Sequence, residues 1–270
     1  MFDTHCHLNF KAFDGQVEQV IKRAKKAGVN YFVVPGTDLE TSKRAVELAE
    51  KYSEIYVAVG IHPHHAREIS IQHSVSCIQD LLKSKKVVAI GEVGIDKYVY
   101  KKTKYENYQI NPEFVQAQKQ LFIAQIKLAV KYKKSLIIHN REATGETLAI
   151  LGESSILDPL AGHIVFHCCE ANDCLLKFAL AHHIYIGVDG DVTYSLSKKE
   201  FVKKIPLELL VLETDSPLLL PEPLRSQKKY PNEPKNLVLI AQKIAEIKKT
   251  SINQLIKVTD DNSKKLFQIS

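Results

Sequence analysis

The sequence has few cysteines and no long apolar segment. Its five cysteines are an odd number, and Cys168 and Cys169 are adjacent, so we do not expect a disulfide framework. The cysteines form no C-x-x-C pair, so we count none of them as a zinc ligand. Apolar runs such as Leu209 to Leu212 are far too short to span a bilayer, and we expect neither a targeting peptide before Phe2 nor a membrane partner. These features predict a protein of the reducing cytoplasm.

The chain also lacks a linker rich in glycine, proline or serine, an internal repeat and a low-complexity tract. Its 270 residues, 45% hydrophobic and 25% charged, are typical of a globular protein with a sizeable core. The net charge of +6 is compatible with a polyanionic partner but does not require one, because lysine-rich helix surfaces give the same sum. This length suits one large α/β domain or two small ones, and we predict a single domain over residues 1–270.

Short apolar runs alternate with segments of helical periodicity along nearly the whole chain. The predicted strands are Phe2–His7, Tyr31–Val34, Ile55–Val59, Val87–Ile90, Leu136–Ile138, Ile164–Phe166, Ile184–Val188 and Leu210–Leu212. The predicted helices are Gln16–Ala27, Glu40–Tyr52, Ser70–Leu82, Pro112–Tyr132, Thr147–Leu151, Asp173–His182, Lys198–Lys204, Lys235–Lys248 and Ile252–Val258. Eight βα units in about 250 residues predict an α/β fold, a TIM (β/α)8 barrel. A doubly wound sheet is the alternative, but no G-x-G-x-x-G follows a strand.

A histidine or a carboxylate follows six of the predicted strands. These residues are His5, His7, His62, Glu92, His139, His167 and Asp215. Because the active sites of TIM barrels lie at the carboxyl ends of the strands, we expect these side chains to meet at one mouth. Each has an ordinary explanation alone, such as a turn residue or a solvated loop acid, but six strand ends of this kind are hard to obtain by chance. The remaining histidines, including His64, are predicted to be surface or structural residues.

The first pair sets the geometry that we expect. His5 and His7 are separated by one residue, so on a strand their side chains point to the same face. Cys6 then points to the other face, where a small buried apolar residue is expected.

The types of these side chains indicate a metal site. Four histidines with Glu92 and Asp215 make a mixed set of nitrogen and oxygen donors that is too rich for one tetrahedral ion. A carboxylate between two histidine pairs can bridge two ions about 3.5–4 Å apart, which is the arrangement for hydrolysis and phosphoryl transfer. This donor set does not choose cleanly among Mg²⁺, Mn²⁺ and Zn²⁺.

The strand-end residues lie within longer motifs. The motifs are Asp3-Thr4-His5-Cys6-His7-Leu8, Gly60-Ile61-His62-Pro63-His64, Ile90-Gly91-Glu92-Val93-Gly94-Ile95-Asp96, Ile138-His139-Asn140-Arg141-Glu142-Ala143, Phe166-His167-Cys168 and Glu213-Thr214-Asp215-Ser216-Pro217. In order and spacing, these motifs resemble those of the TatD family of metal-dependent deoxyribonucleases, within the amidohydrolase-like TIM barrels. Asn232-Glu233-Pro234 and Asn262 to Phe267 also look like signatures of the family. The resemblance covers the whole chain.

The resemblance implies a role for each of these residues. One ion would be held by His5, His7, Glu92 and Asp215, and the second by Glu92, His139 and His167, with Glu92 bridging. Asp215 would also accept a proton from the attacking water, and His62 would approach the scissile phosphate. Arg141 would be a second cation for the phosphate, because its planar fork donates two parallel hydrogen bonds. The alternative for Arg141 is a surface residue at the start of a helix.

One departure from the family follows His167. The chain has Cys168-Cys169-Glu170-Ala171 where the family usually has Cys, an aromatic residue, Ser and Gly. Losing the glycine changes the backbone freedom of this loop. Glu170 also adds negative charge near a site that should receive an anionic phosphate.

We therefore expect a metal-dependent hydrolase, a nuclease that cleaves phosphodiester bonds of DNA from single-stranded ends with a water activated by two divalent ions. The expected ions are Mg²⁺ first, then Mn²⁺ or Zn²⁺, RNA is a further substrate, and the expected state is a monomer. The insertion Lys97 to Tyr108 interleaves tyrosines and lysines that could stack bases and follow phosphates, or it is a solvated loop. One alternative is a hydrolase of the amidohydrolase type that acts on an amide, an ester or a small phosphate compound. Another is a binding protein that keeps a residual metal site.

Overall fold

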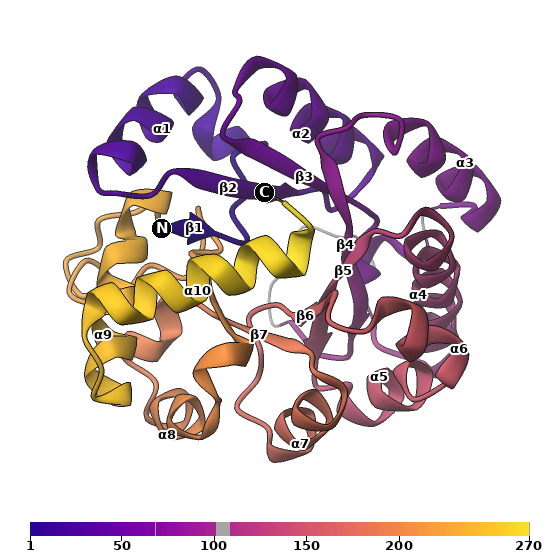
Figure 1. Cartoon of the computed structure of the whole chain (residues 1–270). Helices are drawn as coiled ribbons and strands as arrows, with labels where there is room; N and C mark the ends of the chain where they lie inside the picture. The colour runs from indigo at the N-terminus through magenta and orange to yellow at the C-terminus, as the bar shows by residue number, and fades with distance from the viewer. Residues whose placement is uncertain (68, 101–108, 270) are drawn as a thin grey trace.

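The computed structural model describes residues 1–67, 69–100 and 109–269. Eight strands lie around a central axis in chain order, and every neighbouring pair from β1 to β8 is parallel (Figure 1). The strands are β1 (Phe2–Asp3), β2 (Tyr31–Pro35), β3 (Ile55–Val59), β4 (Val87–Asp96), β5 (Ser135–Arg141), β6 (Ile164–Phe166), β7 (Tyr185–Val188) and β8 (Leu210–Leu212). The predicted TIM barrel is confirmed.

The helices form a ring outside the strands (Figure 1). They are α1 (Val17–Lys26), α2 (Leu39–Lys51), α3 (Ile71–Leu81), α4 (Pro112–Tyr132), α5 (Thr144–Leu151), α6 (Ser154–Leu157), α7 (Asp173–His182), α8 (Leu196–Lys204), α9 (Leu237–Lys248) and α10 (Ile252–Phe267). None of the helices within the described ranges has the length and hydropathy needed to cross a bilayer.

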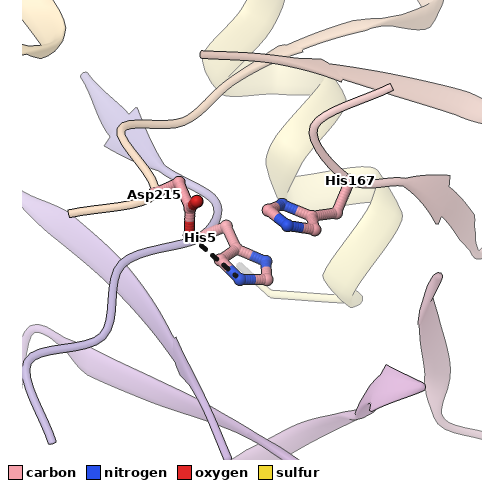
Figure 2. Close-up of side chains that lie close together, drawn as sticks. All are labelled: His5, His167 and Asp215. Carbon is pink, nitrogen blue, oxygen red and sulfur yellow. Dashed lines mark ion pairs between the residues drawn. The ribbon is translucent and has the colours of Figure 1, made fainter. Parts of the chain in front are cut away.

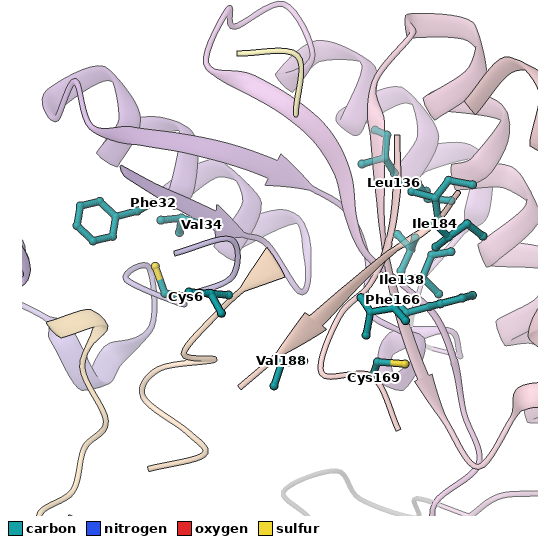
Figure 3. Close-up of a cluster of buried hydrophobic side chains, with 14 of the residues drawn as sticks. Cys6, Phe32, Val34, Leu136, Ile138, Phe166, Cys169, Ile184 and Val188 are labelled. Carbon is teal, nitrogen blue, oxygen red and sulfur yellow. The ribbon is translucent and has the colours of Figure 1, made fainter. Parts of the chain in front are cut away.

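Two apolar layers hold the barrel together. The outer layer lies between strands and helices, and Figure 3 shows part of it, with Cys6 beside Phe32 and Val34. Cys6 is fully buried and its thiol approaches the Val33 carbonyl oxygen, so the prediction of a small buried apolar residue is confirmed. Burial raises the pKa of this thiol, which keeps it protonated and unreactive.

The inner layer fills the barrel and is closed by the last helix. Each strand contributes one inward residue to it: Phe2, Val33, Ala58, Ala89, Ile137, Val165, Tyr185 and Val211. Leu266 and Phe267 of α10 pack against this set, and α10 crosses the barrel axis in Figure 1. Because these inward residues precede the polar strand ends, α10 closes the amino-terminal end of the barrel and leaves the carboxyl-terminal end open. The prediction that this helix ends at Val258 was wrong, because Leu266 and Phe267 extend its apolar face.

The seam between the first and last strands is closed by hydrogen bonds rather than by a ladder. No strand pairing joins β1 to β8 among the described residues. Instead, Thr4 N–H donates to the Leu212 carbonyl at 3.0 Å, and the buried Asp3 carboxylate accepts from Thr214 N–H at 3.0 Å and its hydroxyl at 2.7 Å. The segments that follow β1 and β8 are thereby tied to one another.

The predicted first strand, Phe2–His7, was wrong in its length. It ends at Asp3, and the segment after it bonds to the segment after β8: Asp215 N–H donates to the His5 carbonyl and His7 N–H to the Ser216 carbonyl. Conversely, β4 and β5 run beyond their predicted ends, Ile90 and Ile138, to Asp96 and Arg141, because their ladder resumes at Val93 after a register shift. The structure also adds the short helix α6, which the sequence pattern did not predict.

A close approach between β4 and β5 fixes this ladder. Gly94 pairs with His139 at a φ of +146°, and a methyl group there would lie 1.9 Å from the His139 carbonyl oxygen. Gly94→Ala should therefore lower the free energy of unfolding by about 1–3 kcal/mol through backbone strain, measured by denaturant unfolding. Gly145→Ala on α5 is the control, because a methyl group there meets no atom within 4 Å. Equal stabilities of the two variants would contradict the close approach.

Candidate metal centre

A cavity of about 1000 Å³ opens at the carboxyl-terminal end of the barrel. Six of the seven predicted strand-end residues line it: His7, His62, Glu92, His139, His167 and Asp215. His5 lies directly beneath them and is fully buried. The structure therefore brings all seven predicted strand-end residues together.

The first histidine pair comes from the seam rather than from a strand. His5 Nε2 and His7 Nε2 lie 3.2 Å apart, and they lie 3.8 Å and 3.4 Å from Asp215 Oδ1. Figure 2 shows Asp215 above His5 and the ring of His167 beside the ring of His5. The two histidine rings are stacked, with their centroids 3.5 Å apart. Asp215 has a φ of +48°, a left-handed conformation that non-glycine residues rarely adopt outside constrained sites.

Glu92 lies between two sets of histidines. Its Oε2 atom faces the first pair, 3.5 Å from His5 Nε2 and 3.8 Å from His7 Nε2. Its Oε1 atom faces the second pair, 2.9 Å from His139 Nδ1 and 3.5 Å from His167 Nε2. The two oxygens of one carboxylate are thus directed to two different histidine pairs.

These donors fit divalent metal ions. Their ligand atoms form several groups of three that lie within 4.8 Å of one another, among them His5, His7 and Glu92 on one side and Glu92, His139 and His167 on the other. Neutral imidazoles and carboxylates are the donors that Zn²⁺, Mn²⁺ and Mg²⁺ take in proteins. Five of the six predicted ligands are buried, where a charge needs a partner.

The pKa values of Glu92 and of the histidines around it show how the charges of the cluster are balanced. Burial alone would raise the pKa of Glu92, but the surrounding histidines outweigh it, so the pKa lies well below its usual value. Burial likewise opposes the charged forms of His139 and His167, yet neighbouring carboxylates raise their pKa values to about 9 and about 10. Burial lowers the pKa of His62, which is therefore neutral at pH 7.

Three residues of the site were not predicted as site residues. His64, predicted as a surface or structural residue, lines the cavity, and its Nε2 lies 2.9 Å from Asp96 Oδ2. Asp96 also accepts from His139, and Glu213 from His167. The alternation of side chains offered a signal, since Asp96 lies four residues after Glu92 and Glu213 two before Asp215.

Arg141 lies at the edge of the cavity and is held by two tyrosines. Its guanidinium carbon lies 3.9 Å from the ring centre of Tyr98, and its Nη1 donates to the Tyr100 hydroxyl at 3.0 Å. These tyrosines belong to the predicted nucleic-acid insertion, of which residues 101–108 lie outside the described residues. Arg141 therefore presents an ordered cation to the cavity rather than a free surface side chain.

Glu170, the departure from the family pattern, also lines the cavity. Its carboxylate accepts from the Asn140 side-chain amide at 2.8 Å and from Glu142 N–H at 3.1 Å. Cys168 adopts a φ of +43°, and the buried Lys198 ammonium donates to the Cys169 carbonyl. The loop is thus fixed without a glycine, and part of the negative charge of Glu170 is balanced by N–H donors.

Comparisons with known proteins place the chain beside metal-dependent hydrolases. The family model described as TatD related DNase matches residues 2–268. An uncharacterized metal-dependent hydrolase, YabD of Bacillus subtilis, is 36% identical over 272 residues, which cover 100% of both chains. A protein named 3'-5' ssDNA/RNA exonuclease TatD, from Edwardsiella piscicida, is 33% identical over 275 residues and 100% of both chains.

A solved structure agrees with these sequence matches. The TatD homolog YjjV from Escherichia coli superimposes with a TM-score of 0.87 at 28% identity, over 100% of this chain and 98% of that chain. The shared fold covers the barrel from its first strand to its last helix.

We predict that metal binding releases protons and strengthens as the pH rises. His139 and His167, with pKa values of about 9 and about 10 in the metal-free protein, carry protons at pH 7 that must leave before their second nitrogens can bind a metal. Raising the pH from about 7 to about 9 removes this competition. Calorimetric titration of Mn²⁺ in two buffers of different ionisation enthalpy measures the released protons. An affinity that does not change over this range would contradict the protonated state.

Proposed function

The chain belongs to the TatD related DNase family and is a metal-dependent hydrolase, and from this we propose that it hydrolyses phosphodiester bonds of single-stranded nucleic acid at a two-metal centre. The observation that carries the proposal is the position of Glu92, whose two oxygens face two histidine pairs. One carboxylate that serves two ions is the arrangement expected for phosphoryl transfer. The relatives named as ssDNA/RNA exonucleases support a nucleic-acid substrate.

We propose the following ligand sets. His5, His7, Glu92 and Asp215 would hold one ion, and Glu92, His139 and His167 the other. When bound, two such ions lower the pKa of water and stabilise negative charge on the attacking and leaving oxygens. Asp215, whose pKa remains below its usual value because the histidines offset its burial, is ionised and able to accept a proton from the attacking water.

His62 is proposed as a donor to the scissile phosphate. Its Nδ1 accepts a hydrogen bond from His64 N–H at 3.2 Å, so the proton of the neutral ring is on Nε2. That Nε2 lies 3.6 Å from Glu92 Oε1, at the edge of the second histidine pair. An N–H at this place would donate to a phosphate oxygen rather than bind a metal.

Arg141 is proposed as the second cation for the phosphate. Its guanidinium lies over the rings of Tyr98 and Tyr100, and its bond to the Tyr100 hydroxyl uses one N–H, which leaves other N–H groups for an anion. Guanidinium groups bind phosphate through two parallel hydrogen bonds. Because the side chain is already ordered, less entropy is lost when it binds.

The surface around the cavity favours a single strand over a small phosphate compound. Six large hydrophobic side chains are exposed among the described residues, and two of them line this cavity. Leu218 and Tyr230 line it, while Val99 and Leu196 are adjacent to residues that do. Lys228 and Lys229, both exposed, precede Tyr230. An exposed aromatic ring beside lysines suits the bases and phosphates of a single strand.

Mg²⁺ is proposed as the activating ion, with Mn²⁺ and Zn²⁺ as alternatives that the four imidazoles also suit. We propose that residues 1–270 act as one catalytic domain and as a monomer. Five free cysteines support a cytoplasmic location.

End-labelled single-stranded DNA tests the proposed activity. With Mg²⁺, the wild-type protein should give a ladder of shortened products, and the label at either end reports the direction of cleavage. Glu92→Ala should lower the rate by at least about 100-fold, since a charge at the reacting centre is worth several kcal/mol, and EDTA should abolish the ladder. RNA and acylated amino acids are assayed in parallel.

The same assay separates the alternatives. Cleavage of the acylated amino acids alone, by a protein that holds its metal ions, would replace the nuclease by an amidohydrolase-type enzyme. Binding of DNA without turnover in Mg²⁺, Mn²⁺ and Zn²⁺ would indicate a binding protein.

Tyr230 provides a second test. Tyr230→Ala should weaken binding of an oligonucleotide about tenfold, because stacking of one base contributes about 1–3 kcal/mol. Tyr31→Ala is the control, since Tyr31 is also exposed but begins β2, at the opposite end of the barrel. Fluorescence anisotropy with labelled DNA measures both affinities. An equal effect of the two substitutions would exclude a base-stacking role for Tyr230.

A further inference from the structure

We propose that Glu170 is a positioning residue that holds Arg141 in place for an anionic group of the substrate. The inference rests on the role proposed above for Arg141 and names the residue that fixes it. Glu170 is also a position at which the chain departs from the family pattern. It gives a function to a carboxylate whose charge alone would oppose an anion in the cavity.

The carboxylate of Glu170 binds the two residues that flank Arg141 in the chain. Its Oε2 atom accepts from the Asn140 side-chain amide at 2.8 Å, and its Oε1 atom accepts from Glu142 N–H at 3.1 Å. Asn140 is buried, and Glu142 has a φ of +54°, a left-handed conformation just after the end of β5. Arg141 therefore lies between two residues whose positions depend on one carboxylate.

The end of β5 needs this support because the two neighbouring strands pair with it over different lengths. On one side the ladder with β4 continues to Arg141, and Lys97 N–H donates to the Arg141 carbonyl oxygen at 2.9 Å. On the other side the ladder with β6 ends at the pair of Ile138 and Phe166. Beyond that pair, the Glu170 carboxylate supplies an acceptor for backbone and side-chain N–H groups that the ladder no longer pairs.

The loop that carries Glu170 is itself fixed on both sides. Before Glu170, the buried Lys198 ammonium donates to the Cys169 carbonyl oxygen and lies 3.3 Å from Asp191 Oδ2. After it, Asn172 N–H donates to the Glu170 carbonyl oxygen at 2.7 Å. A carboxylate on such a loop can act as a fixed support for the end of β5.

Arg141 is thus held at both ends of its side chain. Tyr98 and Tyr100 hold the guanidinium group, and Glu170 holds the backbone from which the side chain starts. A guanidinium aligned in this way can bind a phosphate through two parallel hydrogen bonds. A misplacement of about 1 Å in such a contact can cost as much as about 100-fold in rate.

The alternative role of Glu170 is a charge that repels anions from the cavity, and the two roles predict opposite results. Loss of a repelling charge should strengthen phosphate binding, whereas loss of a support for Arg141 should weaken it. Glu170→Gln keeps the size of the side chain but replaces one acceptor oxygen by an NH₂ group. One of the two N–H donors then loses its acceptor.

Calorimetric titration of the Mg²⁺-loaded protein with inorganic phosphate measures this difference. We expect Glu170→Gln to weaken phosphate binding about tenfold, which is the effect of one hydrogen bond to a charged group. In an Arg141→Ala background the same substitution should change the affinity less than about twofold, because the residue that Glu170 positions has lost its guanidinium. A merely structural role of Glu170 would not depend on Arg141.

Two further variants separate position from charge. Asn140→Ala leaves the charge of Glu170 in place but removes one of its donors, so it should also weaken phosphate binding, by about threefold or more. Glu142→Gln is the matched control, because it removes an exposed negative charge from the same strand end and keeps the N–H that binds Glu170. It should change the affinity less than about twofold. Denaturant unfolding checks that each variant is folded.

Tighter or unchanged phosphate binding in Glu170→Gln, an equal loss in Glu142→Gln, or an equal loss in the Arg141→Ala background would overturn the proposal. An unchanged affinity in Arg141→Ala alone would overturn it as well. A failure to cleave nucleic acid would leave it intact, because the titration uses no nucleic acid.

Discussion

A buried carboxylate surrounded by histidines is the interaction on which the rest of this site depends. Glu92 is 4% exposed, and an ionised carboxylate at that depth needs compensation. The compensation comes from segments that are far apart in sequence, with His5 at one end of the chain and His167 beyond its middle. A proton and a metal ion compete for the same donor atoms. The histidines that balance the charge of the cluster with protons in the free protein can therefore exchange these protons for metal ions.

The barrel makes this convergence possible, and its seam shows how. The ends of β1 and β8 are joined by the Asp3–Thr214 hydrogen bonds, and the chain continues from that joint into His5 on one side and Asp215 on the other. Meanwhile α10 closes the opposite end with Leu266 and Phe267. One end of the barrel is packed for stability and the other is left polar, which is the division of labour typical of this architecture.

Much of the fold and of the site could be predicted from the sequence. Apolar strands that end in a polar residue indicate both the parallel sheet and the end of the barrel that carries the site. The failures have specific causes. A strand through His7 was expected from the His-x-His spacing, but backbone bonds to Asp215 and Ser216 hold that segment instead. Asp96 and Glu213 were overlooked because each is bonded to a histidine from another strand, and only the tertiary structure gives that contact. Spacing along the chain shows which residues share a face, not which nitrogen of a ring points inward.

We propose that Glu92 lies between two ions, and anomalous diffraction from crystals loaded with Mn²⁺ tests this position. We expect two peaks about 3.5–4 Å apart, one beside His5 and His7 and one beside His139 and His167, with an oxygen of Glu92 on each. A single peak, or two peaks that Glu92 does not join, would exclude a bridging role for Glu92.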